Sequence, residues 1–227
     1  LFLLSCLVQA QMTVGTSMTP AQLVQNVLLG NGITVSNITY NGVPSPATPQ
    51  AGSGSFAANP ASFAISDGII LSSALAGSIP GSEPGINSDF LGTGSDPDLL
   101  DIIGDLNPSG PQSNDKAVLE FDFIPTGDSV KFNYIFASEE YPGYNCSPQF
   151  NDVFGFFISG PGITGDPGIG NDKNIALVPG TSQAVTINNV NNAANAGHYL
   201  DNAGGQYVQY DGFTQELSAA SAVEPCQ

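Results

Sequence analysis

Hydrophobic and polar residues alternate in two neighbouring stretches near the middle of the chain. In VLEFDF (118–123), apolar residues alternate with Glu120 and Asp122, and VKFNYIFA (130–137) shows the same period of two. This period places alternate side chains on opposite faces of a β-strand. The turn sequence PTGD between the stretches predicts a hairpin at the centre of the domain, with Lys131 opposite Glu120 or Asp122. The rings expected to fill the core are Phe121, Phe123, Phe132, Tyr134 and Phe136.

The rest of the chain adds further strands and one helix. Thr19 as N-cap and Pro20 at the first helical position, followed by an apolar stripe up to Gly30, predict a short helix near the N-terminus. Residues 74–114 are rich in Gly, Ser, Pro and Asp and are expected to form long loops. No repeat of 20–50 residues is visible. We therefore expect an all-β fold, an antiparallel sandwich or jelly roll with one short N-terminal helix. The other expected strands are 33–40, 67–73, 152–159, 175–178, 184–187 and 206–210.

The first residues have the features of an export signal. The apolar stretch LFLLSCLVQAQ has small residues at Val8 and Ala10, which predicts cleavage after Ala10, although Cys6 could instead be a lipoprotein cysteine. Residues 1–10 are thus interpreted as a signal peptide remnant and 11–227 as a single β-sandwich domain. No later stretch has the ~20 apolar residues that a membrane-spanning helix needs, so no direct membrane insertion is expected.

Two cysteines remain once the signal is removed. Cys146 and Cys226 form an even pair in an exported protein, which predicts a structural disulfide between them.

The charge of the chain is strongly one-sided. Twenty Asp and Glu residues face three Lys and no Arg, which gives a net charge of −17. This charge repels phosphate backbones and argues against a nucleic-acid partner. Two interpretations of the acidity stay open, and they are compatible: solubility outside the cell, and coordination of Ca²⁺ by some of the carboxylates.

The densest polar cluster comprises FASEEYPGYN (136–145) and QFNDVFGFFISGPG (149–162). Glu139, Glu140, Asn151 and Asp152 are candidate Ca²⁺ ligands, because calcium takes oxygen ligands. Capping of turns by the same side chains is the alternative. Adjacent residues on a strand point to opposite faces, so Glu139 and Glu140 are not expected to form a glycosidase pair.

A second acidic cluster lies in GSDPDLLDI (94–102). Asp96 and Asp98 are candidates to reach the same metal site, or else to form Asx turns. An EF-hand is excluded because the sixth and twelfth positions counted from Asp96 hold Asp101 and Asn107 instead of Gly and Glu.

Catalytic motifs are absent from the sequence. His198 is the only histidine, and there is no G-x-S-x-G, no P-loop, no G-x-G-x-x-G after a strand and no zinc-type Cys/His spacing. We therefore expect a protein that is not an enzyme.

Residues 118–162, with the signature SEEY…FNDVFGFF…SGPG, resemble the core of the choice-of-anchor L domain. GSDPDL (94–99), 174–191, YLDN (199–202) and QYDGFT (209–214) extend the resemblance over nearly the whole mature chain. It implies an exported bacterial surface protein sorted by a C-terminal anchor. Similar proteins continue beyond a Pro-Cys like Pro225-Cys226, so we expect this chain to be truncated at its C-terminal end. Covalent or secretion-system anchoring would then lie in a C-terminal region that is absent here.

Together these features predict a secreted, non-enzymatic adhesion or recognition module of the bacterial cell surface, stabilised by Ca²⁺ and binding an extracellular glycan or protein ligand. Two alternatives belong to other classes. One is an exported polysaccharide hydrolase that uses an Asp/Glu pair, and the other is a purely structural spacer of a large surface protein.

Overall fold

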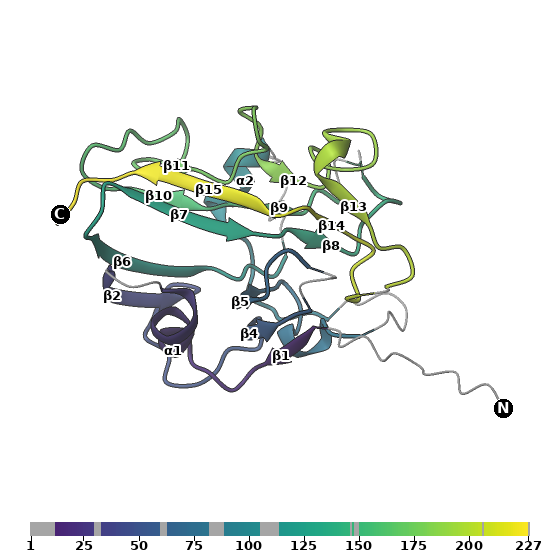
Figure 1. Cartoon of the computed structure of the whole chain (residues 1–227), viewed down its shortest axis with the longest axis horizontal. Coiled ribbons are helices and arrows are strands. Elements are labelled where there is room, and N and C mark those ends of the chain that lie inside the picture. Colours follow the sequence, from purple (N-terminus) through teal and green to yellow (C-terminus); the bar gives the residue numbers. More distant parts are fainter. Residues whose placement is uncertain are drawn as a thin grey trace.

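The structure is a computed structural model that describes residues 12–29, 33–59, 63–81, 89–104, 114–145, 147, 150–205 and 207–226. The predicted signal peptide remnant therefore lies outside the described residues. The described chain is built from short antiparallel strands with two α-helices, which confirms the all-β class (Figure 1).

The predicted N-terminal helix is present. Helix α1 (Pro20–Leu23) begins at Thr19, whose side chain accepts a hydrogen bond from the Gln22 N–H while the Gln22 side chain bonds back to the Thr19 N–H. This reciprocal capping box fixes the helix start. The helix continues as a π-helical turn, η1 (Val24–Leu28). Leu23 and Val24 are fully buried, so the apolar stripe packs inward as expected.

The strands form six small antiparallel sheets. Their orders are β1-β4-β5, β3-β2-β6, β15-β7, β13-β14-β8, β12-β9 and β10-β11. The strands are β1 (Thr13–Gly15), β2 (Ile33–Tyr40), β3 (Val43–Pro44), β4 (Ser53–Ala57), β5 (Asp67–Leu71), β6 (Leu119–Pro125), β7 (Ser129–Tyr134), β8 (Ala137–Ser138), β9 (Val153–Phe154), β10 (Phe157–Ile158), β11 (Lys173–Asn174), β12 (Val185–Thr186), β13 (Tyr199–Asp201), β14 (Gly212–Thr214) and β15 (Leu217–Ala222). Two 3₁₀ turns complete the order, η2 (Ala76–Ser78) and η3 (Ala196–His198).

The predicted central hairpin is wrong. The strands β6 and β7 exist, but β6 pairs with β2 and β7 pairs with β15. Residues 126–128 therefore join two sheets instead of closing one hairpin. As a consequence Lys131 lies opposite Ala220 and not opposite Glu120 or Asp122. The turn sequence marks a reversal of the chain, while the partner of each strand lies about 80–90 positions away in the sequence.

The predicted direction of the side chains on these strands is confirmed. Along β6 and β7 the burial alternates with period two, and Tyr134 and the following Phe136 are buried. Phe121, Phe123 and Phe132 are half-buried. Phe132 stacks on Phe156 with ring centroids 4.6 Å apart, and Tyr134 lies 4.6 Å from Phe154. The larger core cluster thus lies between β7–β15 and the segment that runs from residue 154 to 190.

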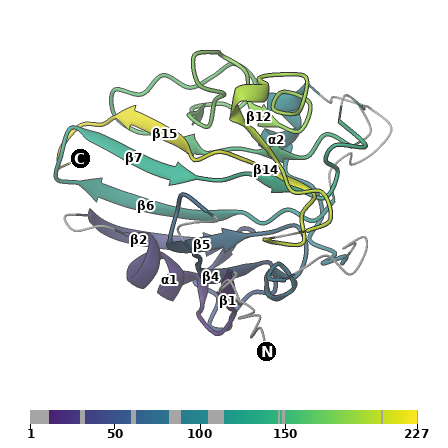
Figure 2. The same cartoon turned by 45° about the vertical axis from the view of Figure 1, so that its right-hand side comes forward.

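A smaller core cluster joins the N-terminal and C-terminal parts of the chain. Its buried members are Phe63, Ile79, Val208 and Phe213. Of the predicted strand 206–210, the described residues 207–210 contribute an isolated bridge between Val208 and Pro80. In Figure 2 the strands β15, β7, β6 and β2 lie one above another, and α1, β4 and β1 lie below them.

A second helix lies inside the region predicted to be loops. Helix α2 (Pro97–Ile103) is capped by Asp96, whose carboxylate accepts hydrogen bonds from the N–H groups of Asp98 and Leu99. Pro97 occupies its first turn, and Gly104 ends the helix in the left-handed conformation with φ +68°. Asp–Pro at the start and Gly at the end are the usual boundary signals of a helix. The fold therefore has one more helix than predicted.

The predicted disulfide is not formed. Cys226 is a free, exposed cysteine, and Cys146 lies outside the described residues. The backbone N–H of Cys226 bonds to Pro125, beside the 126–128 turn at one end of β7. Ser147, in contrast, follows the segment that leaves the other end of β7 and accepts a hydrogen bond from Asn188.

Candidate functional site

The segment that was predicted to carry the site forms a turn between two short strands. Residues 139–145 follow β8 and lead towards β9. β8 pairs with β14, and β9 pairs with β12, so both ends of the segment are tied to strands from the C-terminal part of the chain. The turn itself is closed by the Tyr144 N–H, which donates to the Glu140 carbonyl.

Tyr141 anchors this turn in the core. Its side chain is 1% exposed, and its hydroxyl donates to the Val190 carbonyl. The ring lies 4.9 Å from that of Tyr199 and edge-on to Phe136. Burial raises the pKa of Tyr141 above its ordinary value, with smaller contributions from Tyr199 and Asp152. The phenol therefore stays neutral and acts as a fixed anchor for the turn.

Asp152 and Glu140, both predicted as calcium ligands, lie on either side of Ser138. The Ser138 hydroxyl donates to the Asp152 carboxylate over 2.6 Å and accepts from the Glu140 N–H over 2.9 Å. Partial burial and the Asp152 charge raise the pKa of Glu140. Asp152 is exposed as a whole residue. The protein around its carboxylate reduces the access of water to that group and so raises its pKa, and the hydrogen bond from Ser138 lowers this pKa in part. The buried Ser138 side chain thus joins the Asp152 carboxylate to the backbone of Glu140.

Glu139 and Asn151 lie in the same neighbourhood. Glu139 and Asp152 both add to the raised pKa of Tyr210, after the main effect of burial. Asn151 does not point its carbonyl oxygen at a common centre, because that atom accepts the backbone N–H of Asn188. Asn151 therefore acts as a brace between its own segment and the loop that follows β12.

Asp96 and Asp98 belong to a separate acidic group around α2. Burial raises the pKa of Asp98, and the charges of Asp96, Asp172, Asp101 and Glu120 raise it further. Neither Glu140 nor Asp152 is among the charges that act on Asp98, and Asp98 is not among those that act on them. Within the described ranges, no group of three or more His, Cys, Asp or Glu side chains is arranged to hold a metal ion. Of the six predicted calcium ligands, Glu140 thus feels the charge of Asp152, and Asp98 feels that of Asp96.

A pair of exposed aromatic rings lies beside the turn, and the sequence reading missed it. Tyr144 is 53% and Phe150 42% exposed, and their ring centroids are 4.9 Å apart. Next to them the Asn145 amide donates to the Asn192 side chain over 2.7 Å. We call Tyr144, Phe150, Asn145 and Asn192 the aromatic patch. In the sequence, two aromatic residues within a Gly-, Pro- and Asn-rich turn could have indicated this patch. Asn192 could not be found this way, because only the fold brings it to Asn145.

Side-chain hydrogen bonds hold the backbone that carries the aromatic patch. Asn188 donates to the Ser147 carbonyl, and the Ser147 N–H bonds to Tyr144. Asn191 is fully buried, and its side chain bonds to Ile187 and to the N–H groups of Ala193 and Ala194, which shapes the loop that presents Asn192. The aromatic patch is therefore held by side-chain amides that bond to backbone.

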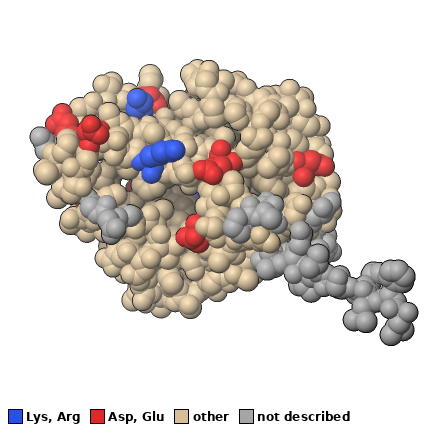
Figure 3. All heavy atoms as spheres, in the orientation of Figure 1, with Lys and Arg blue, Asp and Glu red and all other residues tan. Residues whose placement is uncertain are grey.

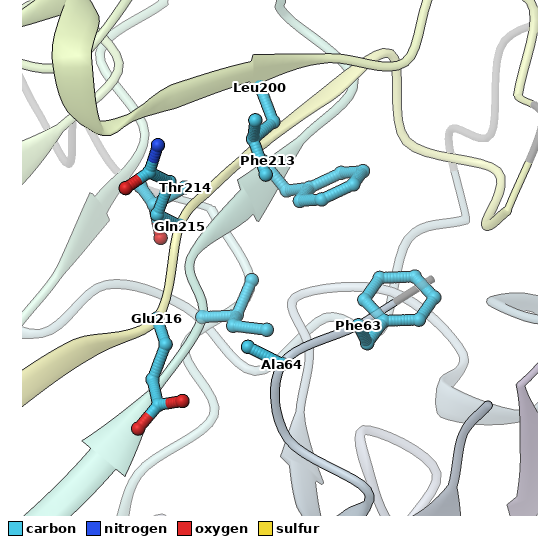
Figure 4. Close-up of a pocket in the computed structure, with 8 residues that line it drawn as sticks. Phe63, Ala64, Leu200, Phe213, Thr214, Gln215 and Glu216 are labelled. Carbon is cyan, nitrogen blue, oxygen red and sulfur yellow. The ribbon is translucent and has the colours of Figure 1, made fainter. Parts of the chain in front are cut away.

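An apolar pocket of about 380 Å³ lies elsewhere on the molecule (Figure 4). Figure 4 shows the rings of Phe63 and Phe213 at one side and the polar ends of Gln215 and Glu216 at the other. Glu216 is the one ionisable residue in its lining, so the pocket offers a binding surface and no acid–base pair. It is lined by Phe63, Ala64, Ile135, Leu200, Phe213, Thr214, Gln215 and Glu216.

The surface carries few basic groups. On the face shown in Figure 3, acidic side chains are spread over the surface and basic ones are rare, in agreement with the net charge of −17. No helix in the described part of the chain is both long and apolar enough to cross a membrane.

The family model of the choice-of-anchor L domain matches residues 10–227, nearly the whole chain. No curated protein and no solved structure matches the chain.

Proposed function

Because the chain belongs to the choice-of-anchor L domain family of bacterial surface modules, we propose that it is a non-enzymatic recognition module that binds an extracellular glycan through the aromatic patch. The family is one of extracellular or surface proteins and is not a known enzyme family. The observation that carries the proposal is the exposed pair Tyr144–Phe150 beside the hydrogen-bonded pair Asn145–Asn192.

The chemistry of the patch suits a sugar. A pyranose ring has apolar C–H faces, which pack on aromatic rings, and hydroxyl groups, which need donors and acceptors at its edge. Tyr144 and Phe150 supply exposed ring faces, and the tyrosine hydroxyl adds a polar group at the rim. An asparagine amide offers both donors and an acceptor, as a sugar hydroxyl does. Hydrophobic rings and neutral amides therefore lie together within a protein that is otherwise strongly acidic.

The rigidity of the turn also supports binding. Tyr141 below the turn is fully buried, and the Asn188 and Asn191 side chains fix the adjoining backbone. A surface that is already ordered loses little conformational entropy when a ligand binds. The aromatic patch thus has the features of a preformed binding surface.

A glycan array with the purified domain tests the proposal. Tyr144→Ala and Phe150→Ala should each reduce binding to the recognised glycan about 5- to 30-fold, because each ring contributes on the order of 1–2 kcal/mol of contact. The matched control is Phe90→Ala, which removes an aromatic ring that is 74% exposed outside the patch. Equal binding by all three variants, or no glycan bound by the wild type, would contradict the proposal.

A polysaccharide hydrolase is the second candidate, and one observation favours it. Glu140 has a raised pKa beside the Asp152 carboxylate and close in sequence to the exposed rings. A general acid with a raised pKa and a second carboxylate are the two groups that glycoside hydrolysis requires. Release of reducing sugar from a bound glycan, abolished in Glu140→Gln, would establish this function. Binding without turnover would leave recognition, and no binding at all would leave a structural spacer.

A further inference from the structure

The apolar pocket of Figure 4 has a buried base and an open rim. Its most buried members are Phe63, Phe213 and Thr214, none of which is more than 5% exposed. Its exposed members, which lie at the opening, are Ala64, Leu200, Gln215 and Glu216. A ligand can therefore enter from solvent and reach aromatic rings that lie below the surface.

The walls of the pocket are already fixed by contacts within the protein. The Thr214 N–H donates to the Phe136 carbonyl over 2.8 Å, and the Thr214 hydroxyl accepts the Phe136 N–H over 3.0 Å. The rings of Phe63 and Phe213 lie 5.3 Å apart, and Phe63 also packs edge-on against Tyr207 at 6.2 Å. A site with fixed walls loses little conformational entropy when a ligand binds.

The size of the pocket fits a small molecule and not a protein partner. Its volume of about 380 Å³ lies at the lower end of the range for small-molecule sites, ~300–1,000 Å³. Eight residues line it, whereas a stable protein–protein interface takes about 20–30 residues from each side. The ligand is therefore a compact molecule whose apolar part covers the rings.

The polar side of the pocket favours positive charge. In Figure 4 the ends of the Gln215 and Glu216 side chains lie apart from the aromatic rings. The lining contains no Lys, Arg or His, so no lining residue neutralises the Glu216 carboxylate. An ammonium group at this position would gain an ion partner. The carboxylate of a fatty acid would instead be repelled by Glu216 and by the net charge of −17.

We propose that this pocket is a binding site for a small organic amine, a molecule in which an apolar body carries a protonated amino group. The apolar body lies among Phe63, Phe213 and Leu200, and the ammonium group lies at Glu216. None of these four residues belongs to the aromatic patch, so this site and the glycan-binding function can fail independently.

Three probes that share a phenylbutyl body and differ in the end group test the proposal: 4-phenylbutylamine, 4-phenyl-1-butanol and 4-phenylbutyrate. Each is titrated into the isotopically labelled domain at pH 7 and low salt, and NMR measures its affinity. A ligand of this size should bind with a Kd of about 1–5 mM. The amine should bind most tightly and the carboxylate most weakly, and the amide signals of Phe63, Leu200 and Phe213 should shift.

Two pairs of surface variants separate the charge from the apolar contact. Glu216→Gln should weaken binding of the amine about threefold and leave that of the alcohol unchanged, because it removes the partner of the ammonium group. Its matched control is Glu224→Gln, which removes the same charge from an exposed residue outside the lining. Leu200→Ala should weaken all three probes at least about threefold. Leu75→Ala, at a residue 42% exposed against 40% for Leu200, should weaken none.

Three results would overturn the proposal: no shifted signal at ~10 mM amine, an affinity for the amine no higher than that for the alcohol, or an equal loss of amine affinity in Glu216→Gln and Glu224→Gln. The last result would mean that the overall charge of the protein attracts the amine, and not the pocket.

Discussion

At the scale of single residues, neighbouring side chains of the turn differ in burial and therefore in what they can do. Tyr141 is buried and hydrogen-bonded, and it holds the turn in place, whereas Tyr144 three residues later is half in solvent. The Ser138 hydroxyl donates to the Asp152 carboxylate and accepts the backbone N–H of Glu140, and the charge of Asp152 adds to the burial that raises the pKa of Glu140. Stability and the recognition proposed above thus depend on neighbouring positions of one short segment.

Phe132 tests the core at this scale. Replacement of Phe132 by Ala removes the ring that stacks on Phe156 at 4.6 Å and should lower the free energy of unfolding by about 3 kcal/mol, the low end for a core phenylalanine because the residue is only half-buried. Urea denaturation of both proteins measures this. Phe90→Ala serves as the surface control and should change stability by less than about 0.5 kcal/mol. Similar losses in the two variants would contradict the assignment of Phe132 to the core.

Glu140 tests the coupled carboxyl groups. Its pKa is raised above the ordinary value of 4.5, so the folded protein binds this proton more readily than the unfolded chain does. Ionised Glu140 therefore destabilises the fold above the raised pKa, and the cost disappears as the pH falls below 4.5. Glu140→Gln should raise Tm at pH 7 by about 1–3 °C and have no effect near pH 4.

The exposed Glu216→Gln is the control for this pH series, because it removes one negative charge away from the Asp152 carboxylate. A gain in Tm for Glu140→Gln that persists unchanged at pH 4, or an equal gain for Glu216→Gln at pH 7, would show that the local coupling is not the cause.

At the scale of elements, the two helices begin in the same way. Thr19-Pro20 and Asp96-Pro97 each place a capping oxygen before a proline, which has no N–H to leave unpaired and a φ suited to the first turn. The first helix was expected because an apolar stripe follows it. The second was missed although Leu99, Leu100, Ile102 and Ile103 are apolar, because the region around it is rich in Gly, Ser, Pro and Asp and suggests loops.

Asp96 tests the cap of α2. Asp96→Ala should cost about 0.5–2 kcal/mol, because the N–H groups of Asp98 and Leu99 lose their acceptor. Asp96→Asn keeps the acceptor oxygen and removes one of the charges that raise the pKa of Asp98, so it should be neutral or slightly stabilising. Thermal unfolding of both variants at pH 7 compares them. Equal destabilisation would show that the charge of Asp96, and not its capping oxygen, matters.

At the scale of the whole molecule, the acidity of the chain is distributed and not concentrated at one centre. The carboxylates around Asp98 and those around Asp152 form two groups, each with its own repulsion. Turn capping explains part of this acidity, since Asp96 caps α2 and Asp115 accepts the backbone N–H groups of Leu91 and Thr93. Calcium binding stays a prediction of the sequence.

Thermal melting with calcium and then with EDTA tests that prediction. A cation bound only by the folded state should stabilise it by about 2.7 kcal/mol at a hundredfold excess over Kd. Asp152→Asn and Asp98→Asn each remove a carboxylate from one of the two groups and should identify the one that binds. An unchanged midpoint in all three proteins would exclude calcium and leave turn capping and solubility as the explanation of the acidity.

The sequence by itself determined what depends on near neighbours. The alternation along β6 and β7 fixed which side chains face the core, because successive side chains of a strand point to opposite faces whatever its partner is. Thr19 and Pro20 fixed the start of α1 for an equally local reason. The family resemblance also depends on sequence alone, and the match over residues 10–227 agrees with it.

The tertiary structure decided which segments meet. Any strand edge can bond to any other, so the pairing of β6 with β2 and of β7 with β15 depends on packing between residues about 80 positions apart. The same cause brings Asn192 to Asn145 and leaves Cys226 beside Pro125. Backbone hydrogen bonds are the same for every residue, so they do not specify which strands pair. The packing of side chains selects the partner strand.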